Sequence, residues 1–433
     1  MKKILFRNAT LVTLDPQQPL LSNACLAVAG EKIEAVGQAP DGCFDRVIDA
    51  GGLILMPGLV NAHTHSPMTL FRGLKDDCTL DEWLNKYIWP AEAQLDREGC
   101  YWGSLLGIAE MLATGTTSVS DMYRSSGELI RAAAEAGIKA NICESIVSDG
   151  DFDPHTHAGI RESQETIDKW NGFDHGRIRC DTSIQSCWQT DEPLWRYIAD
   201  FAAERGIGIH VHLAETQSEI AHCRQAYGDS PVRLLERAGV FQNRVIAVHG
   251  IYLDDEDQRI LKEHNACIVH DPASNLKCCC GFAHLKPYWE KGIHLALGTD
   301  GVCSNNSADM FDTIKLTSLV QKMLSGDPCF LPAEELLRMA VEGGLFSQGR
   351  TGESGMLRPG LDADLIAVSA EEPSMIPCLS PAANLVYSAS GAMVRMTMVR
   401  GKILYENSEF TTIDMEQLKQ KVKAIVTPFR KKG

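Results

Sequence analysis

Between residues 57 and 345, short apolar runs alternate with amphipathic helical patterns, and this alternation constrains the fold more than any other feature of the sequence. Several of the helical patterns end at Gly or Asn, as helices commonly do. The apolar runs are residues 58–63, 116–122, 138–145, 177–186, 208–215, 244–250, 266–272 and 294–300. Strands that alternate with helices in this way predict an α/β fold of the (β/α)8 TIM-type barrel class. A doubly wound sheet is the rival, but no G-x-G-x-x-G motif opens a helix after the first strand, which disfavours it.

The two ends of the chain differ from this central region. Residues 1–56 and 356–405 contain strand and turn patterns with almost no helical signal, and an amphipathic helical pattern follows near the C-terminus. We therefore expect residues 57–355 to form a catalytic barrel. Residues 1–56 and 356–433 are expected to form a small β-sandwich domain built from both termini.

Ionisable residues gather at the ends of four predicted strands, and a parallel barrel carries its chemistry at these carboxyl ends. The first strand ends in His63 and His65, which share a face because they are two residues apart. The ends of the fifth, sixth and eighth strands supply His212, Glu215, His249 and Asp300. Three imidazoles and one carboxylate can hold a divalent ion and leave a position for water. His63 and His65 are therefore predicted to be metal ligands, with partners among the residues at the other strand ends.

Other possible ligands have weaker patterns. His210 lies two residues deeper than His212 on the same face, which indicates a place in the barrel interior behind the ligands. His270 ends the seventh strand, where it could line a pocket or hydrogen-bond locally. Cys278, Cys279 and Cys280 are adjacent, so in an extended segment they cannot readily ligate one metal. Packing, a place in the pocket wall, and a metal or redox role all remain open for these thiols.

Charge and composition limit the partners. The net charge of −16 argues against nucleic acid and acidic membrane surfaces. The sequence contains no run of 18 or more apolar residues, so no membrane span is expected, and the N-terminus lacks the apolar core of a secretion signal. Fifteen cysteines without such a signal suggest reduced thiols in a cytoplasmic enzyme. A small-molecule substrate is the expectation.

Several motifs taken together resemble the amidohydrolase superfamily over essentially the whole chain. They read PGLVNAHTHSPMTLFRG, HVHLAET, AVHGIYL, HDPASNLK, LGTDGVCSNNSADMF and GMLRPGLDADLIAV. The resemblance is strongest to the branch that contains S-adenosylhomocysteine/5′-methylthioadenosine deaminases and triazine chlorohydrolases. It implies a barrel with a composite β-sandwich and one divalent ion held by His63, His65, His212 and Asp300. Zinc is the expected ion, with iron(II) or manganese(II) as alternatives. The fourth strand, RIRCDTSIQS, lacks the bridging lysine of binuclear relatives, so a single ion is expected.

The resemblance also implies a reaction. An aminated N-heterocycle would be hydrolysed to release ammonia. His249 and Asp300 would orient the attacking water and accept its proton, while Glu215 would protonate a ring nitrogen and help ammonia to leave. A triazine-type chlorohydrolase is the alternative. A catalytically inactive barrel scaffold is disfavoured because every ligand position is filled. A homo-oligomer, either a dimer or a tetramer, stays open.

The expected substrate contacts match the family only in part. Glu92, in IWPAEAQL, matches a glutamate that binds ribose hydroxyls. Glu144 and Gln185 stand where an arginine and a histidine are expected, and Arg161 lies near the position of a second arginine. Because a lost polar contact discriminates strongly against a ligand, the substrate stays open among purine or adenosine-like, pterin, pyrimidine and triazine rings. The candidate substrate-binding residues are Glu92, Glu144, Arg161, Gln185, His270 and Ser304.

Overall fold

Two five-stranded parallel sheets form the centre of the protein in a computed structural model that describes residues 2–148, 150 and 152–429. Their strand orders are β15-β6-β7-β8-β9 and β10-β11-β12-β13-β14. The strands are β6 (Leu59–His65), β7 (Thr116–Tyr123), β8 (Lys139–Glu144), β9 (Ile178–Cys180), β10 (Thr182–Ile184), β11 (Ile209–Leu213), β12 (Val245–His249), β13 (Cys267–His270), β14 (His294–Leu297) and β15 (Asp300–Gly301). The eight apolar runs of the sequence supply all ten segments, so the parallel α/β class is as predicted.

The two sheets meet where strands are interrupted. Only Asp181 separates β9 from β10, and its N–H donates to Ile142 O at 3.1 Å. Gly298 and Thr299 separate β14 from β15, and Thr299 N donates to His63 O at 3.1 Å. A Cβ on Gly298 would lie 2.9 Å from the His63 backbone, so glycine permits this close approach. The arrangement fits a TIM-type barrel.

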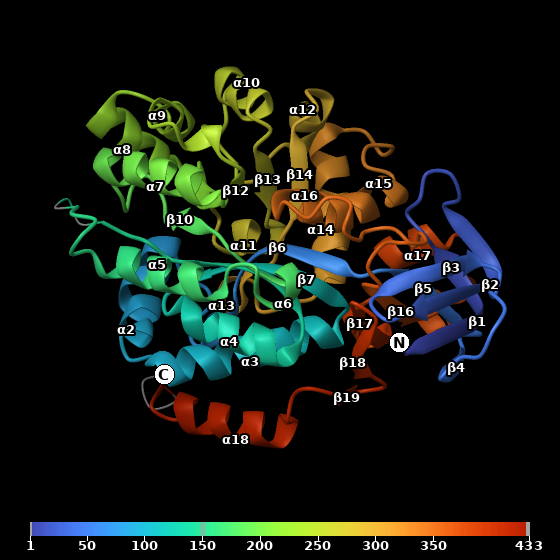
Figure 1. The fold of residues 1–433 in the computed structure, drawn as a ribbon. Helices are drawn as coiled ribbons and strands as arrows, with labels where there is room; N and C mark the ends of the chain where they lie inside the picture. The colour runs from blue at the N-terminus through green and yellow to red at the C-terminus, as the bar shows by residue number, and fades with distance from the viewer. Residues whose placement is uncertain (1, 149, 151, 430–433) are drawn as a thin grey trace.

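Helices surround these sheets (Figure 1). Local signals set their ends: α10 begins with a capping box between Asp254 and Asp257, and α7 ends at Gly206 in the left-handed conformation. The helices of the central region are α1 (Leu80–Glu82), α2 (Trp89–Glu92), α3 (Arg97–Ala113), α4 (Ser126–Ala136), α5 (Ala158–Trp170), α6 (Phe173–Gly176), α7 (Glu192–Arg205), α8 (Gln217–Tyr227), α9 (Pro231–Arg237), α10 (Asp255–Glu263), α11 (Pro272–Lys277), α12 (Leu285–Glu290), α13 (Val302–Asn305), α14 (Met310–Ser325), α15 (Ala333–Arg338) and α16 (Gly344–Ser347). None of the helices in the described part of the chain is long and apolar enough to cross a membrane.

Strands from both ends of the chain pair in one nine-stranded sheet, seen beside the central region in Figure 1. Its order is β19-β18-β17-β16-β5-β1-β2-β3, and β4 pairs with β1. Apolar side chains from both ends form one cluster, in which Leu26 and Met398 are fully buried. The strands are β1 (Lys3–Val12), β2 (Leu20–Ala29), β3 (Lys32–Gly37), β4 (Arg46–Asp49), β5 (Leu53–Pro57), β16 (Leu365–Ser369), β17 (Val394–Val399), β18 (Lys402–Glu406) and β19 (Glu409–Phe410).

The C-terminal segment also contacts the central region. Helix α17 (Pro381–Tyr387) packs on α14 and α15, and α18 (Met415–Val426) packs on α3. Figure 1 shows α18 running below α3 and α4, away from the nine-stranded sheet. Lys139, at the start of β8, is buried between Asp362 and Asp364, with an Nζ to Oδ2 distance of 2.7 Å to each. This buried ion-pair cluster ties the central sheets to the segment that leads into β16.

Candidate active site and metal centre

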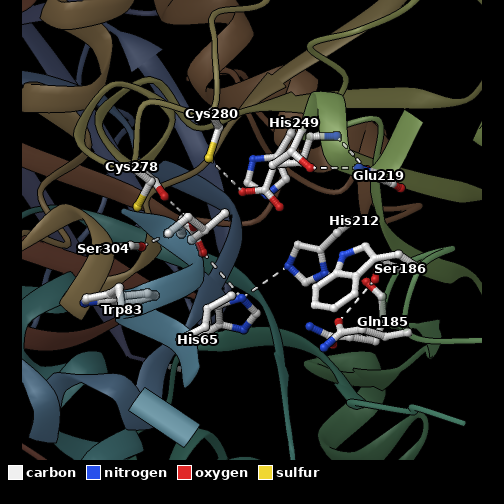
Figure 2. A pocket seen from close by; sticks show the side chains of 18 of the residues that line it. His65, Trp83, Gln185, Ser186, His212, Glu219, His249, Cys278, Cys280 and Ser304 are labelled. Carbon is white, nitrogen blue, oxygen red and sulfur yellow. Dashed lines mark hydrogen bonds and ion pairs between the residues drawn. The ribbon is translucent and has the colours of Figure 1, made fainter. Parts of the chain in front are cut away.

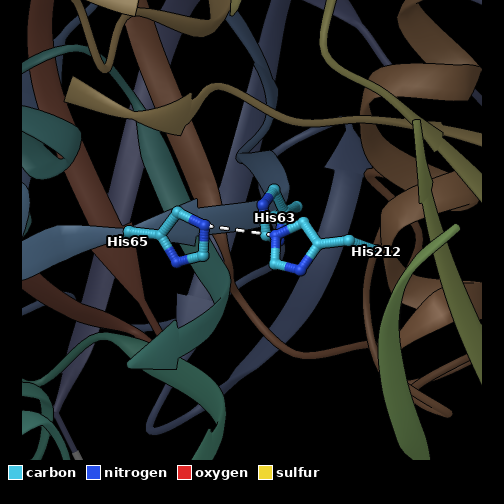
Figure 3. Close-up of side chains that lie close together, drawn as sticks. All are labelled: His63, His65 and His212. Carbon is cyan, nitrogen blue, oxygen red and sulfur yellow. Dashed lines mark hydrogen bonds between the residues drawn. The ribbon is translucent and has the colours of Figure 1, made fainter. Parts of the chain in front are cut away.

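Three histidines from the first and fifth strands converge at the carboxyl edge of the parallel sheets (Figure 3). His63 and His65 end β6, and His212 lies in β11. One ring nitrogen from each lies within 4.8 Å of the others, and the Nε2 atoms of His65 and His212 are 3.3 Å apart. Burial lowers the pKa of His63 to about 3, so this ring is neutral.

Backbone partners fix the protons of two of these rings. His65 Nδ1 bonds the carbonyl oxygen of Met122, and His212 Nδ1 bonds that of Gln185 at 2.7 Å. Since a carbonyl oxygen only accepts, both Nδ1 atoms carry the proton. The two Nε2 atoms therefore present lone pairs to each other at 3.3 Å, which repel unless a cation lies between them.

His63 and Asp300 complete this cluster. His63 Nδ1 lies 2.9 Å from Nε2 of His210, which sits behind it as the sequence predicted. His63 Nε2 is buried without a hydrogen-bond partner. Asp300 Oδ1 lies 3.4 Å from Nε2 of both His63 and His65. Burial opposes the charge of Asp300, but the interactions with His63 and His65 hold its pKa well below the usual range, so it is ionised.

These donors fit one divalent ion. Zinc ligands about 2.0–2.1 Å from the metal in a tetrahedron lie about 3.3–3.4 Å from one another. The measured separations among His63, His65, His212 and Asp300 include 3.3, 3.4 and 3.4 Å. Neutral imidazoles and an ionised carboxylate are also the donor types that zinc, iron(II) and manganese(II) accept.

Hydrogen bonds from hydroxyl groups hold the carboxylate of Asp300. Its Oδ2 accepts from Ser274 Oγ at 2.5 Å and from Ser304 Oγ at 3.2 Å, while Gly301 N donates to Oδ1 at 2.6 Å. The backbone of Asp300 is left-handed, with φ of 57°, as is that of His249, with φ of 74°. Such conformations cost free energy in non-glycine residues and occur often where function requires them.

His249 and Glu215 lie beside the cluster. His249 Nδ1 is 3.0 Å from Asn275 Oδ1, an acceptor, so Nδ1 carries the proton and the Nε2 lone pair is free. That Nε2 lies 3.8 Å from Glu215 Oε2. The backbone N–H of Glu215 donates to Glu219 Oε2 at 2.8 Å, and burial raises the pKa of Glu219 to about 8. An imidazole nitrogen and a carboxyl group thus face each other next to this cluster.

These groups open into one pocket with a volume of about 1110 Å³ (Figure 2). Of the six candidate substrate-binding residues, Glu92, Gln185 and Ser304 lie on its wall. Burial raises the pKa of Glu92, although the Tyr123 hydroxyl opposes this by donating to Glu92 Oε1 at 2.5 Å. The aromatic wall of the pocket consists of Trp83, Trp89, Tyr123, Trp188 and Tyr252.

Three predicted substrate contacts do not lie on the described wall of this pocket. The carboxylate of Glu144 accepts from the backbone N–H groups of Ser125 and Ser126, at the start of α4. Arg161 is exposed on α5. His270 is buried, and its ring packs edge-on against Phe282 with the ring centroids 4.9 Å apart.

Several partners were missed in the sequence. Ser274 and Asn275 bond Asp300 and His249 from α11, and Glu219 bonds the backbone of Glu215 from α8. The signals were available in part, since Ser274 and Asn275 are polar residues within the motif HDPASNLK and Glu219 follows Glu215 by four residues. Whether these side chains point toward the site depends on how α8 and α11 are oriented relative to the strands that precede them.

The model of the protein family described as "Amidohydrolase family" matches residues 54–404 of the chain. The chain belongs to the amidohydrolase family. This confirms the family that the motifs indicated, and it makes the protein a hydrolase of that family.

Curated relatives are similar over nearly the whole chain. The chain is 38% identical over 418 residues to a 5′-deoxyadenosine deaminase of Methanosarcina acetivorans, covering 96% of each protein. It is 38% identical over 426 residues to a 5-methylthioadenosine/S-adenosylhomocysteine deaminase of Acetivibrio thermocellus, covering 98% of each. The deaminase branch named from the sequence is thereby confirmed.

Solved structures share the fold. An adenosine deaminase from Xanthomonas campestris with bound zinc matches with a TM-score of 0.93 and 30% identity, covering 99% of both chains. Atrazine chlorohydrolase TrzN from Arthrobacter aurescens TC1 complexed with zinc matches with a TM-score of 0.88 and 25% identity, covering 98% of this chain and 100% of that one. Both of these structures contain zinc.

Proposed function

We propose that the protein is a metal-dependent deaminase that releases ammonia from an adenosine-like nucleoside. The observation that carries this proposal is the convergence of lone pairs from His65, His212 and Asp300 beside Glu215 and His249 in one pocket. The names of the relatives, deaminases of 5′-deoxyadenosine and of 5-methylthioadenosine/S-adenosylhomocysteine, support the reaction class.

The proposed cofactor is one zinc ion held by His63, His65, His212 and Asp300. When bound, the ion supplies a Lewis acid and lowers the pKa of a coordinated water toward neutrality. The backbone partners of His65 and His212 keep their Nε2 lone pairs directed at the centre. A ligand histidine whose other nitrogen is fixed in this way binds more tightly than a free one.

Two residues are proposed to move protons. His249 can accept a proton at Nε2, because Asn275 holds the proton of the other nitrogen on Nδ1. Glu215 can donate the proton of its carboxyl group to a ring nitrogen. It can then take up a proton that comes from the attacking water and pass it to the amine, so that the amine departs as ammonia. General acid–base help of this kind is worth about 10²–10⁴-fold in rate.

The pocket charges favour a nucleoside without an anionic tail. The acidic side chains on the described wall are Glu92, Glu215, Glu219 and Asp300. Arg124 is the single lysine or arginine among the described lining residues, and its guanidinium donates to the backbone carbonyls of Glu92 and Leu95. A phosphate or carboxylate would meet mostly like charge there, so we propose a neutral 5′ substituent packed on the aromatic wall.

The finer fold assignments are also proposals. We propose that the two parallel sheets close into one (β/α)8 barrel over residues 57–355, which the hydrogen bond from Thr299 to His63 across the β14–β15 break supports. Residues 1–56 and 356–433 would form the β-sandwich domain, with α17 and α18 reaching back onto the barrel.

The test is ammonia release by the zinc-loaded protein with 5′-deoxyadenosine, 5′-methylthioadenosine, adenosine, S-adenosylhomocysteine and adenosine 5′-monophosphate. We expect the compounds with neutral 5′ groups to be turned over and the two with anionic groups to be poorer substrates. No ammonia from any of the five would overturn the proposal. A chlorinated triazine is assayed alongside for chloride release, because the likeness to the atrazine chlorohydrolase makes that reaction the second candidate.

A further inference from the structure

The three consecutive cysteines follow helix α11 and contribute to the pocket wall (Figure 2). All fifteen cysteines of the protein are free thiols. Within the triplet, Cys279 is exposed and its Sγ contacts the carbonyl oxygen of Leu276 in its own turn. Cys280 differs, because only 6% of it is exposed and it lies toward the site.

The backbone of Cys280 is held on both sides. Its N–H donates to Asn275 O at 3.0 Å, and its carbonyl oxygen accepts from the Tyr252 hydroxyl at 2.7 Å. The next residue is Gly281, where a Cβ would lie 2.5 Å from the Tyr252 hydroxyl oxygen, so the chain passes closely under this tyrosine. The backbone of Cys280 is therefore fixed by its surroundings.

The thiol of Cys280 reaches Glu215. Its Sγ lies 3.3 Å from Glu215 Oε1, while the other carboxylate oxygen, Oε2, lies 3.8 Å from His249 Nε2. The neighbouring Cys278 thiol and burial keep the pKa of Cys280 far above its usual range, so the group stays an S–H donor. One oxygen of Glu215 is thus held, and the other is left to face His249.

We propose that Cys280 is a positioning residue for Glu215. By donating to Oε1 it holds the carboxyl plane so that Oε2 is directed toward His249 and the substrate. The effect of Cys280 on turnover rests on the proposed function, whereas the hydrogen bond between Cys280 and Glu215 does not. The sequence does not indicate this role, because Cys280 and Glu215 are 65 residues apart.

Kinetics of two substitutions at one position test the contribution to turnover. C280A removes the donor, and we expect kcat to fall about 5- to 10-fold, the size of one hydrogen bond, with KM nearly unchanged. C280S restores a donor and is expected to recover most of kcat. C180A serves as the matched control, since Cys180 is an equally buried thiol in β9, outside the pocket. Zinc content and melting temperature are measured for each variant to verify folding.

The infrared S–H stretch tests the hydrogen bond without any substrate. The difference spectrum between wild type and C280A isolates the Cys280 band, and the same difference is recorded in the E215Q background. We expect a lower frequency in the wild-type background, because a carboxylate is a stronger acceptor than an amide. An identical band in both backgrounds overturns the proposal, as does a C280S variant that is as slow as C280A. Failure of the proposed function would show instead as no ammonia release by wild type, with the band shift intact.

Discussion

Replacing His210 by phenylalanine tests whether the ring behind His63 sets the affinity of the cluster for zinc. His210 Nε2 lies 2.9 Å from His63 Nδ1, and burial lowers the pKa of His210 well below its usual range, so the ring is neutral and can accept. Phenylalanine keeps the planar shape and removes the acceptor. The buried Nδ1–H of His63 then loses its partner, or the proton moves to Nε2 and occupies the lone pair that faces the other ligands.

The expected magnitude follows from this single contact. An outer partner of a metal-bound histidine is worth about 10- to 100-fold in metal affinity, or about 1.4–2.7 kcal/mol. The assay is competition for zinc between the purified protein and a chelator of known affinity. H270F is the matched control, because His270 is equally buried and neither of its ring nitrogens has a hydrogen-bond partner. We expect H270F to bind zinc as wild type does.

Two results would refute the reasoning. If H210F bound zinc as tightly as wild type, the contact with His63 would not orient a ligand. If H270F lost affinity to the same degree, the loss would reflect a disturbed barrel and not the missing acceptor. A third variant, H210Q, offers an amide oxygen at this position and should recover part of the affinity if acceptance from His63 is the cause.

Other parts of the structure make further predictions. E215Q should keep its zinc and lose about 10²–10⁴-fold in ammonia release, and near-normal turnover would contradict the proton role. K139M should lower the free energy of unfolding in urea by about 3–5 kcal/mol, because it leaves the buried carboxylate of Asp364 without its lysine and removes one of the two lysines that pair with Asp362. K32M removes the other lysine that pairs with Asp362, but the Lys32 side chain is 54% exposed, so the expected loss is about 0–1 kcal/mol. If K32M and K139M lowered the free energy of unfolding equally, burial would not be the cause of the larger loss. Burial raises the pKa of Glu144 from 4.5 to about 7, so its contribution to stability is present below pH 4.5 and lost as pH rises through about 7. As pH rises from 4.5 to 8, the stability of E144Q relative to wild type should therefore increase by about 2–3 kcal/mol, measured from unfolding midpoints. A stability difference that stayed constant across this range would contradict the raised pKa of Glu144.

The parallel α/β class and the convergence of the proposed metal ligands were predictable from the sequence. Apolar runs and helical spacing follow from backbone periods that act over a few residues, so they can be counted along the chain. His63, His65, His212 and Asp300 all follow such runs, and a parallel arrangement brings the ends of its strands to one edge. The family resemblance then supplied the reaction class.

The environment of those ligands was decided only by the tertiary structure. His270 ends a strand as His249 does, yet His249 lines the pocket whereas His270 packs against Phe282. Glu144 bonds the start of α4, whereas the Cys280 thiol reaches Glu215 across 65 residues. The physical reason is geometric: near a strand end, a shift of one residue reverses a side chain, and contacts between distant segments depend on how strands twist and loops return. Neither quantity is encoded in a local period of the sequence.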